Sequence, residues 1–133
     1  MTKLKIKVTK EILEKSKYCI ATGKADKGGA GFNCAVALAI RDIFPDAWIH
    51  RDTITPFSFS DNNTEAYFGG ARIHLPNEAI EYIKEFDATP FGMRTSMPEI
   101  EFEVEIPDEI IERISIEELR PLLENHPTLE LVN

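Results

Sequence analysis

The chain lacks any long apolar run, and this absence excludes several classes of protein. Its longest nearly uncharged apolar stretch runs from Cys34 to Ile40, whereas a helix that crosses a bilayer needs about 20 residues. The N-terminus alternates charged and apolar residues from Lys3 to Val8, so it lacks the continuous apolar segment of a signal peptide. We therefore expect a cytoplasmic protein that makes no membrane contact.

Cysteine and histidine are also scarce. The chain has two cysteines, Cys19 and Cys34, and three scattered histidines, and their spacing is not that of a zinc site. A chain of 133 residues can bury enough apolar surface to fold without a disulfide. We expect no metal and no cofactor.

Positive charge is in deficit but unevenly placed. The formal net charge of −8 argues against general nucleic-acid binding, because phosphate contacts require a basic face. Eight lysines lie in the first 27 residues, whereas from Glu99 onward eleven acidic residues accompany two basic ones. Two interpretations remain open. Either the basic and acidic segments neighbour each other in one fold, or they form complementary surfaces between the subunits of a homo-oligomer.

Alternating patterns predict the strands. Residues 3–8 alternate lysine with apolar side chains, and residues 99–106 alternate glutamate with apolar side chains, so each segment predicts a strand with one solvated face. Antiparallel pairing of these two strands would place the lysine row beside the glutamate row. Shorter strands are expected at 47–51, 54–59, 64–68, 71–75 and 129–132, with a hairpin turn at Gly69–Gly70.

Helices are expected in the remaining segments. Thr9 can cap a helix over residues 10–19, and Asn33 can cap one from Cys34 to Ile43 or Phe44. The latter is apolar nearly all round, so we expect it to be buried at the centre. Further helices are predicted at 76–86, 107–114 and 115–124. The sequence therefore predicts one α+β domain over residues 1–133, with a mostly antiparallel sheet, one buried central helix and several short helices.

A glycine-rich segment before the central helix is the first candidate ligand site. A flexible backbone that leads into a helix N-terminus presents free N–H groups to an anion, and lysines add positive charge. The segment matches neither a Walker A loop nor a dinucleotide-binding fingerprint, and an ordinary surface loop fits the same residues. The candidate residues are Lys24, Lys27, Gly28, Gly29 and Asn33.

The second candidate is the segment 89–97. Its Phe91, Arg94, Thr95 and Ser96 supply a ring, a guanidinium and two hydroxyls, the group types that hold a nucleotide or a phosphorylated ligand. An ordinary loop, with the phenylalanine packed inward and the arginine solvated, is the alternative. Residues of the middle strands would join this site if those strands fold toward it: Arg51, together with His50, Tyr67 and Arg72.

Cys34 is the natural candidate for a nucleophile in this sequence. A cysteine in the first turn of a helix can have a lowered pKa. No neighbour in sequence supplies a base, so His50 or His74 would have to reach it through folding. The apolar run that follows Cys34 favours a small buried side chain instead. We predict no catalytic residues and no enzyme activity.

Four segments together resemble a group of small, uncharacterised proteins of bacteria and their phages. The resemblance implies a setting, the bacterial cytoplasm or a phage-infected cell. Small proteins of that setting that lack catalytic motifs often act by binding, and by analogy they include phage sponges that sequester nucleotide immune signals. The segments are Val8–Ser16, Asn33–Pro45, Ile73–Ala79 and Glu101–Ile106.

Three functional hypotheses follow. The leading one is a non-enzymatic, homo-oligomeric binding protein for a small anionic ligand, of which a nucleotide-type immune signal is one example. The second is a protein-interaction or inhibitor module that uses the acidic face of the 99–106 strand. The third is a cysteine-dependent enzyme built on Cys34.

Overall fold

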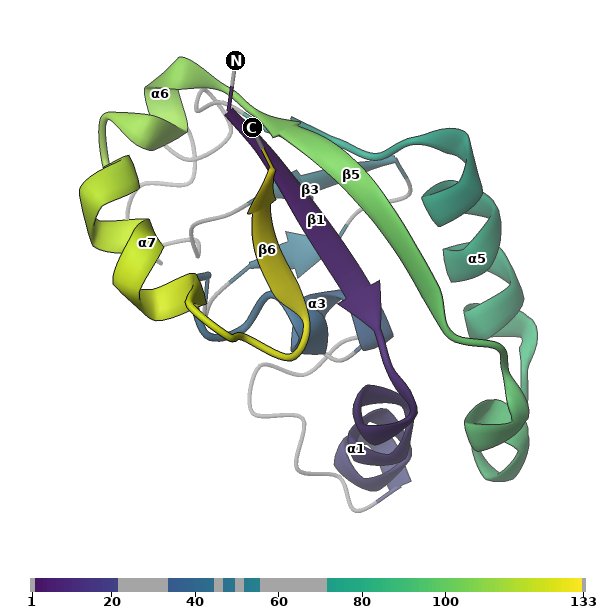
Figure 1. Cartoon of the computed structure of the whole chain (residues 1–133). Helices are drawn as coiled ribbons and strands as arrows, with labels where there is room; N and C mark the ends of the chain where they lie inside the picture. The colour runs from purple at the N-terminus through teal and green to yellow at the C-terminus, as the bar shows by residue number, and fades with distance from the viewer. Residues whose placement is uncertain (1, 22–33, 45–46, 50–51, 56–71, 133) are drawn as a thin grey trace, which may run out of the picture.

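The structure is a computed structural model that describes residues 2–21, 34–44, 47–49, 52–55 and 72–132 (Figure 1). Several expectations lie outside these residues: the glycine-rich segment, the strand at 64–68 and the hairpin turn at Gly69–Gly70. The described elements form an α+β fold with two antiparallel three-stranded sheets, which confirms the predicted fold class.

The first sheet has the basic strand at its centre. Strand β1 (Thr2–Val8) pairs antiparallel with β5 (Ile100–Ile106) on one side and with β6 (Leu129–Val132) on the other. The register sets Lys3, Lys5 and Lys7 opposite Glu105, Glu103 and Glu101. The predicted pairing of the two charged rows is therefore confirmed, and it brings three of the eight N-terminal lysines beside the acidic strand within one chain.

The inner face of this sheet is apolar apart from Thr2 at the start of β1. Helix α3 (Ala35–Ala39) lies behind β1, and the outer, charged face carries no described element in Figure 1. Because side chains alternate between faces along a strand, every second residue of β1 and β5 enters the core. The buried residues of these two strands are Leu4, Ile6, Val8, Phe102, Val104 and Ile106.

The second sheet is smaller and lies behind the first (Figure 1). Strands β2 (Trp48–Ile49), β3 (Thr53–Thr55) and β4 (Ile73–His74) are arranged in the order β2-β3-β4, and each pair is antiparallel. These strands fall within or next to the segments expected at 47–51, 54–59 and 71–75, although their described parts are shorter. Ile49, Ile54 and Ile73 join the same buried cluster as the first sheet.

Helix α1 (Lys10–Ala21) begins where its cap predicts, since the backbone N–H of Ile12 donates to Thr9 Oγ1 at 3.3 Å.

The central helix is shorter than predicted. Helix α3 ends at Ala39, because the Ala39 carbonyl accepts a hydrogen bond from the Thr128 hydroxyl at 2.7 Å, while the Ile43 N–H donates to the Ile40 carbonyl instead. The chain continues as turns to Ile43, so the prediction of a helix to residue 43 or 44 is wrong.

The remaining helices flank the first sheet. Helix α5 (Asn77–Ala88) lies beyond β5, whereas α6 (Asp108–Ile111) and α7 (Ile116–Leu123) lie on the β6 side (Figure 1). The Ser115 cap of α7 is confirmed by the Glu118 N–H, which donates to Ser115 Oγ at 3.2 Å. The segment expected as a loop at 89–97 contains a 3₁₀ helix, η1 (Phe91–Ser96), which packs against α1. Among the described residues, no helix has the length and apolar character that a bilayer crossing requires.

Candidate functional site

Most of the ligand residues expected from the sequence fall outside the described part of the chain. The whole glycine-rich set is among them: Lys24, Lys27, Gly28, Gly29 and Asn33. The same is true of three residues of the middle strands, His50, Arg51 and Tyr67. Their role in ligand binding stays a prediction. The structure describes the segment 89–97, apart from the side chain of Phe91.

Arg94 has a structural role in that segment. Only 5% of it is exposed. Its guanidinium carbon lies 4.2 Å from the centre of the Phe86 ring, and its Nε donates to the Thr89 carbonyl at 3.2 Å. Burial lowers the pKa of Arg94, and the smaller effect of the nearby Asp87 carboxylate raises it. The guanidinium thus ties η1 to the end of α5 instead of facing solvent, whereas Thr95 is half-buried and Ser96 exposed.

Cys34 is buried at the start of α3. Burial raises the pKa of its thiol to about 11, and backbone hydrogen bonds only partly offset this effect. A nucleophilic cysteine requires the opposite shift. The environment of Cys34 is that of the small apolar side chain that its neighbours in sequence indicate.

Cys34 should therefore react very slowly with iodoacetamide in the folded protein. With its thiol pKa at about 11, roughly one thiol in a thousand is ionised at pH 8, and the thiolate is the reactive form. In a Cys19→Ser variant, Cys34 is the one remaining cysteine of the sequence. We expect the alkylation rate of Cys34 in this variant to rise at least ~100-fold in denaturant. Mass spectrometry of timed samples measures both rates. Similar rates in the two states would contradict this assignment and would favour a cysteine-dependent activity.

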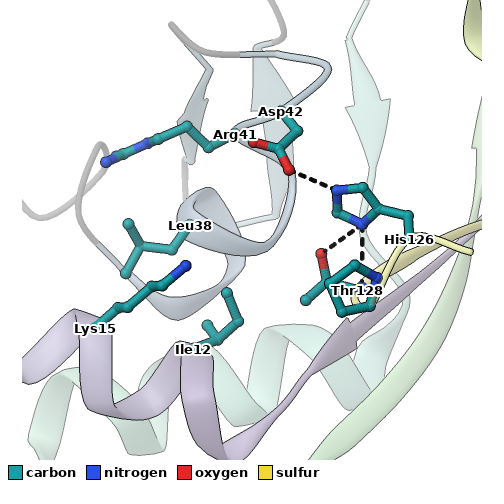
Figure 2. A pocket seen from close by; sticks show the side chains of 8 residues that line it. Ile12, Lys15, Leu38, Arg41, Asp42, His126 and Thr128 are labelled. Carbon is teal, nitrogen blue, oxygen red and sulfur yellow. Dashed lines mark hydrogen bonds and ion pairs between the residues drawn. The ribbon is translucent and has the colours of Figure 1, made fainter. Parts of the chain in front are cut away.

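A concave site lies elsewhere, between α1, the turn after α3 and the segment before β6 (Figure 2). We call it the α1–β6 cleft. Its volume is about 340 Å³, at the lower end of the ~300–1,000 Å³ of ligand pockets. Its walls combine an apolar floor with charged groups at the rim, and the lining residues are Ile12, Lys15, Leu38, Arg41, Asp42, His126, Pro127 and Thr128.

A hydrogen-bonded chain fixes one side of the cleft. The backbone N–H of Thr128 donates to His126 Nδ1 at 3.2 Å, so this nitrogen is the acceptor and the ring proton is on Nε2. His126 Nε2 then donates to Asp42 Oδ2 at 2.6 Å. The His126 side chain is 10% exposed and that of Asp42 73% exposed. A shielded imidazole therefore holds an exposed carboxylate at the rim (Figure 2).

The opposite side of the cleft is basic. Lys15 extends from α1 toward Leu38, beside Ile12, and lines the cleft (Figure 2). Within the described part of the chain, Lys15 makes no ion pair. Arg41, in the turn next to Asp42, also lines the cleft, but its guanidinium points away from Lys15 and His126 (Figure 2). The site thus offers positive charge over an apolar floor, with an oriented carboxylate across from Lys15.

A second cleft, of about 360 Å³, lies between β4 and β5. Arg72 and His74 line one wall, and Glu103 and Glu105 the other. The two glutamates belong to the row that already faces the lysines of β1, and the described residues hold no cluster of three or more potential metal ligands. This cleft therefore gives a weaker indication of a ligand than the α1–β6 cleft does.

Sequence reasoning missed the α1–β6 cleft because its parts are distant along the chain. His126 and Asp42 are 84 residues apart, and neither belongs to a recognisable motif. The expected end of the central helix at residue 43 or 44 also placed Asp42 on a helix surface rather than in a turn. Each of the three comparisons with known proteins returned nothing, since no family model, no curated protein and no solved structure matches the chain.

Proposed function

We propose that the protein is a non-enzymatic binding protein that holds a small organic anion in the α1–β6 cleft. The observation that carries the proposal is the Lys15 side chain, which lines a concave, largely apolar site and whose ammonium has no ion pair among the described residues. A charge-assisted hydrogen bond to a carboxylate or phosphate is the strong contact that such a group can make. The bacterial or phage-infected cytoplasm and a nucleotide-type signal remain part of this proposal.

The apolar floor argues for an organic ligand over an inorganic ion. Ile12, Leu38 and Pro127 line the cleft together with the cations, and apolar surfaces gain free energy when they cover a ring or an alkyl chain. A few polar groups around an apolar surface are typical of small-molecule sites. The volume of about 340 Å³ limits the ligand to about the size of one nucleotide.

The chemistry of the described residues favours binding over catalysis. Both ring nitrogens of His126 are engaged, by the Thr128 N–H and by Asp42, so the imidazole has no free nitrogen to act as a base. The Cys34 thiol is buried, and burial raises its pKa. An interaction module that uses the acidic strand is also less favoured, because Glu101, Glu103 and Glu105 lie opposite the lysines of β1 and the sheet face is not purely negative.

Removal of the Lys15 charge should weaken ligand binding by about 10- to 100-fold, since one hydrogen bond to a charged group contributes about 1.5–3 kcal/mol. A thermal-shift screen of nucleoside monophosphates, sugar phosphates and short carboxylates first finds the ligand, and calorimetry then gives its Kd for Lys15→Ala. Lys84→Ala is the matched control, because Lys84 is equally a surface lysine but lies on α5.

Two outcomes would contradict the proposal: no stabilisation by any compound of the screen at millimolar concentration, or the same Kd for Lys15→Ala and the unchanged protein. Sedimentation of the same samples, with and without ligand, tests the proposed homo-oligomer. The charge pairing between β1 and β5 occurs within one chain, so it gives no support to self-association.

A further inference from the structure

We propose that the ligand of the α1–β6 cleft is bipolar, with an anionic group at the Lys15 side and an N–H donor at the Asp42 side. This inference rests on the proposed function and specifies the ligand of the same site. It depends on the carboxylate at the rim, which places a negative charge in the same site as the Lys15 ammonium. An anion placed between Lys15 and Asp42 meets attraction from one side and repulsion from the other.

Asp42 is positioned to accept further hydrogen bonds. Its Oδ2 accepts from His126 Nε2 at 2.6 Å, and its Oδ1 accepts none from the residues that the structure describes. A carboxylate has about four lone-pair positions on its two oxygens, so most of the accepting capacity of Asp42 is left for a ligand. The 73% exposure of its side chain keeps that capacity accessible.

His126 restricts where the carboxylate can point. The imidazole is fixed from behind by the Thr128 N–H, and Thr128 is itself anchored by its hydroxyl, which donates to the Ala39 carbonyl at 2.7 Å. Sites that recognise a donor hold the acceptor in place through such supporting hydrogen bonds, so less conformational entropy is lost when the ligand binds.

The two ends of the site lie across the apolar floor. Figure 2 shows Lys15 on α1 with Ile12, and Asp42 on the far side of Leu38, next to His126. A ligand that spans the floor therefore carries its anionic group and its N–H donor at opposite ends. Two kinds of metabolite have this chemistry: a guanine nucleotide, whose base edge carries adjacent N–H donors, and an ω-amino acid, whose ammonium and carboxylate are separated by an alkyl chain.

Matched ligand pairs separate these two sources. GMP and IMP differ only in the 2-amino donor of the base, and 6-aminohexanoate and hexanoate differ only in the amino group. We expect the donor-bearing member of one pair to bind about 10- to 100-fold more tightly to the unchanged protein, because one charge-assisted hydrogen bond distinguishes the two members. Calorimetry of all four compounds identifies the pair.

The variant Asp42→Asn tests the role of the carboxylate. An amide retains one acceptor but loses the negative charge, so the preference for the donor-bearing ligand should fall to less than threefold. Asp108→Asn, a surface aspartate on α6, is the control and should keep the full preference. Circular dichroism checks that Asp42→Asn is folded, which the exposure of Asp42 leads us to expect.

The outcomes distinguish this inference from the proposed function. If an anion binds and Lys15→Ala weakens it, but neither pair shows a preference or Asp42→Asn leaves the preference unchanged, the ligand is a simple anion and the inference is wrong while the proposed function stands. If no compound binds, both are wrong. If the preference is present and depends on Asp42, the pair that shows it names the ligand class.

Discussion

Phe86→Ala is expected to lower the free energy of unfolding by about 3–5 kcal/mol, the range for removal of a buried phenylalanine ring. Phe86 is 1% exposed on the inner face of α5, so its replacement leaves a cavity that the surrounding core can fill only in part. The ring also carries the Arg94 guanidinium at 4.2 Å, a contact that contributes about 0.5–2 kcal/mol. Loss of the ring therefore leaves a buried cation without its aromatic support.

Urea unfolding followed by circular dichroism measures this effect. Phe86→Leu fills much of the space but lacks the π face, so we expect a smaller loss, about 1–2 kcal/mol. Glu85→Ala, an exposed neighbour on α5, should change the free energy of unfolding by less than about 0.5 kcal/mol. A loss below about 1 kcal/mol for Phe86→Ala, with an unchanged dependence on urea, would show that this ring is not part of the packed core.

The sequence predicts the elements whose determinants are local or strictly periodic. The lysine row of residues 3–7 and the glutamate row of residues 101–105 predict both strands and their antiparallel pairing, because opposite charges directly across a ladder are favourable. The caps at Thr9 and Ser115 are predicted for the same kind of reason, since each hydrogen bond closes within a few residues.

The features that the sequence does not predict depend on contacts between distant residues. The end of α3 is set by the Thr128 hydroxyl, 89 residues from the Ala39 carbonyl that it meets. Arg94 lies in a segment expected as a loop, where an arginine is normally solvated, yet it is buried against the Phe86 ring and donates to the Thr89 carbonyl. The α1–β6 cleft likewise exists only because Asp42 and His126 meet after folding.

Ile6→Ala is the second substitution with a large expected effect, a loss of about 3–4 kcal/mol in the free energy of unfolding. Ile6 is fully buried in the central strand of the first sheet. It lies opposite Phe102 on β5 and Leu129 on β6, so truncation removes packing on both sides of the strand. We expect a shift of the urea midpoint with little change in its slope.

The neighbouring residue supplies the matched control. Lys5 is on the outer face, where its ammonium lies 3.6 Å from Glu130 Oε2, and a partly exposed ion pair contributes about 0–1 kcal/mol. Lys5→Ala should therefore cost far less than Ile6→Ala, although the two residues are adjacent in sequence. A one-residue slip of β1 would move every side chain to the other face and reverse this order. The comparison thus tests the register of β1 directly, and equal costs at the two positions would contradict the pairing of the lysine and glutamate rows.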